Sequence, residues 1–158
     1  MGDNLEQPRQ RPSEPADRRL RRESAARHRL LRGALGVQTE RDFPWDWAET
    51  QNNLGVAYQD LPTGDRGDNL RRAIACHEAA LRVRTERDFP QDWATTQNNL
   101  GVAYQNLPSG DRADNRRRAI ACYEAAARGY DAAGLTLSEE AERARTAARD
   151  LKTQIEED

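Results

Sequence analysis

The chain has 158 residues, which suits one domain or one short array of small units. Hydrophobic residues make up 36% and charged residues 33%, too few apolar residues for a thick globular core but enough for helices that each bury one stripe. The formal net charge of −2 argues against a general nucleic-acid-binding protein, and no apolar run approaches the roughly 20 residues of a membrane span.

Residues 1–16 are polar and Pro-rich, and they lack the apolar centre of a secretion signal. We expect a disordered lead-in and a cytoplasmic protein. Residues 17–38 predict a helix in which seven arginines face a single acid, Glu23, between positions 18 and 32. This helix could hold RNA, an anionic membrane surface or an acidic partner, or it could be a solvated face whose arginines pair with nearby acids. The arginines are Arg18, Arg19, Arg21, Arg22, Arg27, Arg29 and Arg32.

A tandem repeat follows. Residues 39–84 and 85–130 are identical at 36 of 46 positions, and the ten residues TQNNLGVAYQ occur unchanged at 50–59 and 96–105. Helix propensity dominates both copies, because Ala, Arg, Glu and Leu are frequent and β-branched residues are sparse. Identity of this extent indicates duplication of one structural unit.

Each copy predicts two helices. In the first copy, apolar spacings of four and three predict a helix from about Asp46 to Gln59, with Pro44 at its start and Asp46 as candidate cap. Pro62 and Gly64 then break the helix, and Asp68 or Asn69 is expected to cap a second helix over about 70–84. The second copy predicts the same pair between residues 92 and 128.

Residues 131–158 predict a C-terminal capping helix. Small and apolar residues recur there at spacings of three and four, and Ser138 can cap the first turn. With residues 17–38 as a degenerate half-repeat, the chain amounts to six helices. We therefore expect an all-α fold, a short α-solenoid of antiparallel helix pairs.

These residues resemble the tetratricopeptide (TPR) repeat. Its first helix carries Leu-Gly followed by Tyr, here Leu54-Gly55 with Tyr58 and Leu100-Gly101 with Tyr104. Its second helix carries small, aromatic and small residues, here Ala73, His77 and Ala80, and then Ala119, Tyr123 and Ala126. The resemblance covers about residues 25–130.

The repeat departs from the usual TPR length. An ordinary TPR unit has about 34 residues, and this one is longer, both between its helices and between units. The longer form is similar to the repeats of kinesin light chains and to bacterial arrays that accompany caspase-like CHAT protease domains. The chain contains no such protease domain, so the likeness concerns context only.

The paired asparagines are the main candidates for binding. Asn is a mediocre helix former, so two in succession inside a helix call for a reason. The resemblance implies that first helices line a concave face on which amides bond the backbone of an extended peptide. The alternative is that one Asn of each pair bonds a neighbouring helix. Our choice of ligand-facing residues is Asn52 and Asn98. The full set of candidates is Asn52, Asn53, Gln59, Asn98, Asn99 and Gln105.

Other polar residues predict structure rather than chemistry. His77 corresponds to Tyr123 in the second copy, so we expect it to fill the core. Cys76 and Cys122 lie in equivalent helices whose axes should be about 8–10 Å apart, which favours two thiols over a disulfide. We predict no metal site, no cofactor and no enzymatic activity.

The expected function is a protein–protein interaction scaffold that binds a protein or peptide on the concave face of a TPR-like solenoid. Two alternatives stay open. One is a self-associating structural or regulatory module of a larger bacterial signalling system, and the other is nucleic-acid or anionic-surface binding through residues 18–32.

Overall fold

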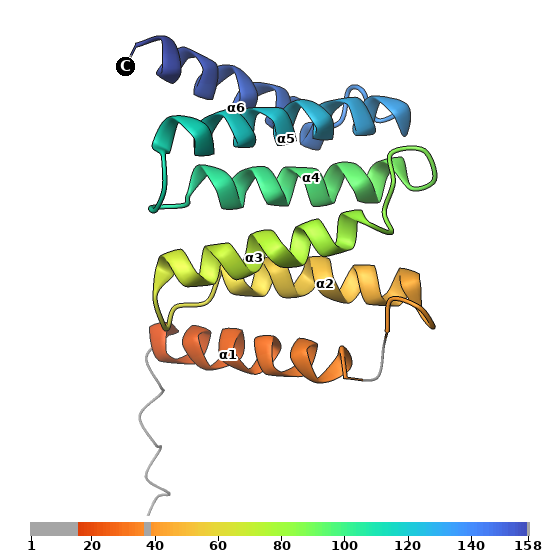
Figure 1. Ribbon diagram of the computed structural model, residues 1–158, viewed down its shortest axis with the longest axis vertical. Coiled ribbons are helices and arrows are strands. Elements are labelled where there is room, and N and C mark those ends of the chain that lie inside the picture. The colour runs from red at the N-terminus through yellow and green to blue at the C-terminus, as the bar shows by residue number, and fades with distance from the viewer. Residues whose placement is uncertain (1–15, 37–38, 158) are drawn as a thin grey trace, which may run out of the picture.

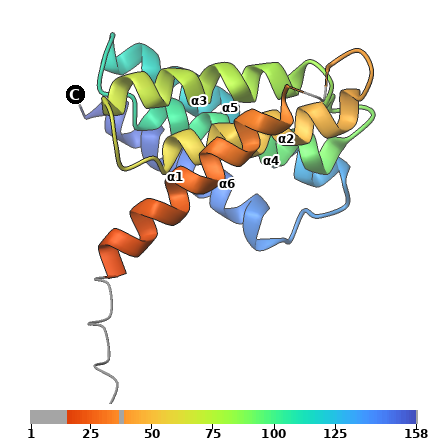
Figure 2. The same ribbon diagram turned by 90° about the horizontal axis from the view of Figure 1, so that it is seen from below.

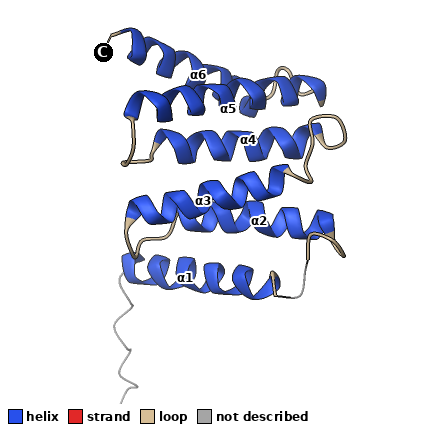
Figure 3. Ribbon diagram, in the orientation of Figure 1, coloured by secondary structure: helices blue, strands red, loops and turns tan. Residues whose placement is uncertain are grey.

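The computed structural model describes residues 16–36 and 39–157 (Figure 1). Within these ranges the chain forms helices and connecting loops but no strand (Figure 3). The helices are α1 (Ala16–Ala34), α2 (Pro44–Gln59), α3 (Arg66–Leu81), α4 (Pro90–Gln105), α5 (Arg112–Ala132) and α6 (Glu139–Glu156).

Successive helices pack against one another in chain order, so the molecule is an all-α, solenoid-like stack with α1 and α6 at opposite ends (Figure 1). Figure 2 shows α3 and α5 in one layer and α2 and α4 in the other, while α1 crosses the end of the stack obliquely. α2 also contacts α4 directly, which joins the first helices of the two copies. The predicted fold class is confirmed.

The first helix of each copy begins two residues earlier than expected. α2 starts at Pro44 and α4 at Pro90, where the missing N–H of proline costs no helical hydrogen bond. The preceding residue, Phe43 or Phe89, occupies the cap position and makes no side-chain cap bond. The prediction that Asp46 caps this helix was therefore wrong, because Asp46 lies inside the first turn.

The second helices also begin early, at Arg66 and Arg112. Asp65 caps α3 by accepting a hydrogen bond from the Asp68 N–H at 2.8 Å, so the prediction of Asp68 or Asn69 as the cap was wrong. The reason is the turn at Gly64, whose φ of 82° reverses the chain immediately before Asp65. Asn69 instead donates its side-chain N–H to the Thr63 carbonyl at 2.8 Å and holds the turn.

The remaining helix ends differ modestly from expectation. α3 ends at Leu81 rather than near residue 84, and α5 extends past residue 128 to Ala132. α1 begins at Ala16, inside the segment predicted to be a disordered lead-in, and residues 1–15 and 37–38 lie outside the described residues. Ser138 caps α6 as predicted, since its hydroxyl accepts a hydrogen bond from the Ala141 N–H at 3.1 Å.

The core runs between the two layers. Its main cluster joins residues of α2, α3, α4, α5 and α6, among them Leu54, Tyr58 and the fully buried Leu70. Leu70 corresponds to Arg116 in the second copy, which is half-buried and lines a hollow near the C-terminal end of the stack. His77 is fully buried, as predicted for a residue that fills the core.

Close approach of the helices within each pair depends on the Leu-Gly step. A Cβ atom at Gly55 would lie 2.5 Å from the His77 ring, and one at Gly101 would lie 2.9 Å from the Tyr123 ring. Both distances are shorter than carbon atoms tolerate, so each ring packs directly on backbone.

Candidate functional site

Four of the six candidate amides hydrogen-bond inside the protein, and three of them join α2 to neighbouring helices. Asn52 is only 7% exposed, and its side-chain oxygen accepts a hydrogen bond from Asn99 at 3.2 Å. Gln59 donates to the Asn99 carbonyl at 3.0 Å and contacts Nε2 of His77 at 2.8 Å. Together these bonds join α2 to α3 and α4. Asn52, Asn99 and Gln59 thus bond a neighbouring helix, which is the second of the two roles considered for these amides.

His77 is held neutral by its surroundings. Burial lowers the pKa of His77 to about 4, well below the ordinary value of 6.5. Because the Gln59 amide nitrogen already donates to the Asn99 carbonyl, its second N–H is the donor to His77 Nε2, which leaves the ring proton on Nδ1. That Nδ1 has no hydrogen-bond partner among the described residues.

The amides of the second copy are more open. Gln105 is exposed, and its Oε1 accepts a hydrogen bond from the Tyr123 hydroxyl at 2.7 Å, so its two N–H donors face outward without a partner among the described residues. Burial raises the pKa of Tyr123 to about 12, so this hydroxyl stays a donor. Asn53 and Asn98 are half-buried, and neither side chain forms a hydrogen bond within the described part of the chain.

Gln105 stands where two hollows meet. One hollow, of about 440 Å³, lies between the C-terminal end of α4 and α6; we call it the α4–α6 groove. The other, of about 500 Å³, reaches the start of α5 and shares Gln105, Leu151 and Gln154 with the groove. The polar lining of the α4–α6 groove is Gln105, Glu139, Glu142, Arg143, Thr146, Asp150 and Gln154.

The α4–α6 groove has an acidic lining. Its lining holds three carboxylates, of Glu139, Glu142 and Asp150, and one guanidinium, of Arg143. Arg143 pairs with Glu139, and Arg145, outside the lining, pairs with Glu142 at 3.8 Å. Between them Ala147 and Leu151 provide an apolar floor. The surface therefore suits a ligand that combines positive charge with apolar contact.

α6 owes its position to α5 rather than to α4. Lys152 pairs with Glu124 at 2.5 Å, and Arg145 pairs with Asp131 at 2.5 Å. The acidic outer face of α6 was missed as a candidate site because the sequence predicted only a solvating cap. The signal was present, since Glu139, Glu142 and Asp150 recur at helical spacing on one side.

A second feature that the sequence analysis missed is a buried arginine between the copies. Arg84 is 4% exposed, donates to the Thr96 hydroxyl at 3.2 Å and lies 5.3 Å over the Trp45 ring. Burial lowers the pKa of Arg84, and the carboxylates of Asp92 and Glu49 act in the opposite direction. Positions 45, 49 and 84 all differ between the copies, which is the sequence signal that links them.

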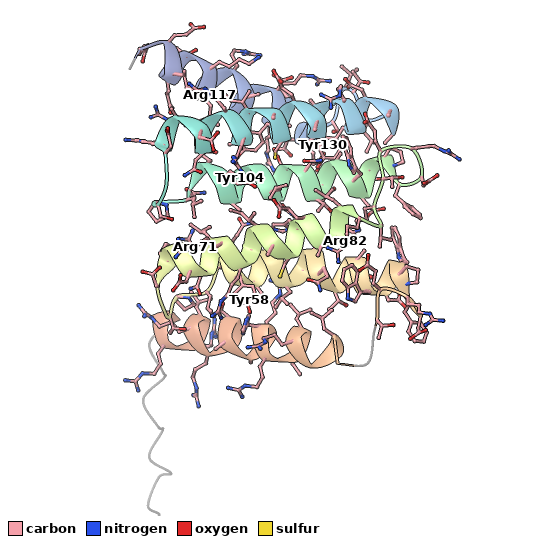
Figure 4. All side chains as sticks on the ribbon, in the orientation of Figure 1. Tyr58, Arg71, Arg82, Tyr104, Arg117 and Tyr130 are labelled. Carbon is pink, nitrogen blue, oxygen red and sulfur yellow. The ribbon has the colours of Figure 1, made fainter. Side chains whose placement is uncertain are left out.

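The tyrosines show how second helices contact the next first helix. Tyr58, Tyr104 and Tyr130 lie at successive levels of the stack (Figure 4). The Tyr104 hydroxyl donates to Glu78 at 2.9 Å, and the Tyr58 ring packs edge-on against His28 of α1 with centroids 4.5 Å apart. α1 is therefore anchored by an aromatic contact on its inner side.

The outer side of α1 is basic. All seven arginines are exposed, and Arg19 pairs with Glu23 at 3.6 Å. Two leucines on α1 are also exposed, Leu20 at 60% and Leu30 at 75%. The surface thus combines positive charge with apolar side chains.

Both cysteines are free thiols. Cys76 and Cys122 are free, as predicted, and burial raises the pKa of each thiol to about 11. Among residues 16–36 and 39–157, no three His, Cys, Asp or Glu side chains gather as metal ligands. Within the same ranges, no helix combines the length and apolar character needed to cross a membrane.

No protein-family model, no curated protein and no solved structure matches this chain.

Proposed function

We propose that the protein is a TPR-like binding module whose partner, an extended peptide or protein segment, lies on the surface around Gln105. The proposal is supported first by the repeat itself, in which Gly55 and Gly101 pack on the rings of His77 and Tyr123. Such packing presents α2 and α4 in a fixed order, so the surface is formed before any partner binds and its ordering costs little entropy.

One observation carries the proposal. Gln105 is exposed at the junction of two hollows with both amide N–H donors unengaged, whereas Gln59, the same residue of the first copy, is committed to His77 and Asn99. An amide held at a fixed position by Tyr123 can donate to a peptide carbonyl as that carbonyl leaves water. Asn98, two turns earlier on the helix that carries Gln105, offers a second open amide.

The test is binding to an array of synthetic extended peptides of varied sequence. Gln105→Glu keeps the oxygen that accepts from Tyr123 but removes the outward donors, and Asn98→Ala removes the second amide. We expect peptides selected on the native protein to bind the double variant at least about tenfold more weakly, which corresponds to about 1.4 kcal/mol.

The matched control is Gln91→Glu, an exposed amide at the start of α4 and outside both hollows. It should leave the affinities of the selected peptides unchanged. If the double variant binds every selected peptide as tightly as the native protein, the surface around Gln105 is not the binding site.

A further inference from the structure

We propose that the α4–α6 groove of one copy receives α1 of a second copy, so that copies of this chain associate head to tail. This inference rests on the binding surface proposed above, takes only its α4–α6 groove, and assigns that groove a helix instead of an extended segment. It is carried by the match between two surfaces that lie at opposite ends of the same molecule (Figure 1).

The first surface is the exposed part of α1, on which Arg27, Arg29 and Arg32 also line hollows beside α2 and the loop that follows it. Arg18, Arg27, Arg29 and Arg32 are exposed and have no ion-pair partner among the described residues, while Leu30 presents three quarters of its surface to solvent. Apolar side chains beside arginines are of no use to a phosphate backbone, which is bound by charge and hydrogen bonds. They suit a protein surface that offers both carboxylates and apolar groups.

The second surface is the groove. Asp150 and Glu142 line it, together with the apolar Ala147 and Leu151. Glu142 also pairs with Arg145 at 3.8 Å. The carboxylate of Asp150 has no ion-pair partner within the described ranges, so it is available to a guanidinium from another molecule. Arginine–carboxylate pairs across such a contact would fix its orientation and suppress wrong partners.

The lengths of the two surfaces agree. At 1.5 Å per residue, the stretch from Arg18 to Arg32 covers about 21 Å, and the stretch from Glu139 to Gln154 covers about 22 Å. Because α1 and α6 lie at opposite ends of the stack, they do not meet within one molecule, and each molecule keeps one free end after pairing. A contact between two different surfaces continues into open chains or closed rings.

The contact is small and charged, so the association should be weak and sensitive to salt. Sedimentation of the full chain at about 0.02 M ionic strength should show a weight-average mass that rises with concentration and reaches at least about twice the 17.9 kDa monomer near 1 mM. At about 0.5 M ionic strength the mass should return to that of the monomer. A mass of one chain under all these conditions would overturn the proposal.

Charge reversal tests which surfaces meet. We expect Arg27→Glu with Arg29→Glu, and separately Glu142→Arg with Asp150→Arg, each to abolish association, and an equimolar mixture of the two variants to restore it. Arg41→Glu with Arg87→Glu makes the same charge change in the loops outside α1 and should leave the association intact. Circular dichroism checks that each variant folds.

The outcomes separate this inference from the proposed function. Association that survives both reversals would show that copies meet elsewhere, and loss in the loop control would show that only overall charge matters. Either result overturns the inference. If the chain stays monomeric while selected peptides still depend on Gln105 and Asn98, the proposed function stands without it.

Discussion

The segment TQNNLGVAYQ occurs in two copies, and the structure gives them different roles. In α2 the next repeat covers the segment, so Gln59 bonds α4 and Asn52 receives Asn99. No further repeat among the described residues covers the segment in α4. The last helix, α6, packs on α5 instead, and Gln105 stays exposed. Gln59 and Asn52 therefore bond the first helix of the next repeat, whereas Gln105 and Asn98 have no such bond within the described residues. The neighbouring helix, and not the segment, decides this difference.

The residue beneath each glutamine also differs. Gln59 meets the imidazole of His77 and Gln105 meets the hydroxyl of Tyr123. Both rings lie against a glycine backbone, but the pKa of the imidazole is about 4 and that of the Tyr123 hydroxyl about 12, so only the imidazole titrates in acid. The first copy is consequently the one that responds to acid.

The largest expected difference between the copies is a pH effect. Because the pKa of His77 is about 4 in the folded chain against about 6.5 when unfolded, the unfolded chain binds more protons between these values. The contribution of neutral, buried His77 to the free energy of unfolding is fully present above about pH 6.5. It is lost as the pH falls towards 4, by about 3 kcal/mol in total.

His77→Tyr, which installs the residue of the second copy, should remove this contribution. Urea unfolding of both proteins between pH 7 and pH 4 measures it as a growing difference in the free energy of unfolding. Burial, with help from Arg32 and Arg72, also lowers the pKa of His28, but His28 is present in both proteins and cancels. Parallel pH profiles would contradict the assignment.

A methyl group at each glycine sharpens the same comparison. Gly55→Ala should destabilise the protein by about 2–3 kcal/mol and Gly101→Ala by about 1 kcal/mol, because the contact with the ring is tighter in the first copy. Gly33→Ala in α1 meets nothing within 4 Å and should stabilise slightly through helix propensity. Urea unfolding ranks the three variants, and equal losses at the two repeat glycines would count against the difference in packing.

Substituting each glutamine by alanine compares the internally bonded Gln59 with the exposed Gln105. Gln59→Ala deletes hydrogen bonds to His77 and to the Asn99 carbonyl and should cost about 2 kcal/mol of unfolding free energy. Gln105→Ala deletes one bond, to Tyr123, and should cost about 1 kcal/mol. Thermal unfolding followed by circular dichroism should therefore give the lower melting temperature for Gln59→Ala, and the reverse order would refute the assigned roles.

The smallest expected effect distinguishes neighbours within one pair. Asn99→Ala removes the bond to Asn52 and should cost about 1 kcal/mol, whereas Asn98→Ala should change the free energy of unfolding by less than about 0.5 kcal/mol. Urea unfolding at neutral pH measures both. A larger loss at Asn98 would mean that its amide is engaged in the folded chain.

Much of the fold could be predicted from the sequence. Duplication set the unit, apolar spacing placed Leu54 and Tyr58 in the core, and equivalence with Tyr123 put His77 there too. Helix starts were less predictable, because Asp65 and Asp68 are both good caps and the choice depends on the backbone turn at Gly64. Either aspartate could cap α3 by its side-chain chemistry, and the turn at Gly64 places Asp65 in the cap position.

The candidate site was predictable only as a set of residue types. Which amide is covered depends on how α2 and α4 are offset sideways, and no spacing within one helix contains that information. Asn52, our choice as ligand-facing, is buried and accepts a hydrogen bond from Asn99, and its binding role stays a prediction. The binding role of Asn98 and Gln105 stays a prediction.

The mismatch between Leu70 and Arg116 has a consequence for assembly of the chain. Near-identical repeats invite misdocking, in which α5 takes the place of α3 on α2 during folding or between two molecules. Such an exchange would put the Arg116 guanidinium into the space that Leu70 fills, and burying a charge there costs several kcal/mol. This single difference between the duplicated copies therefore disfavours docking of α5 on α2, where α3 belongs.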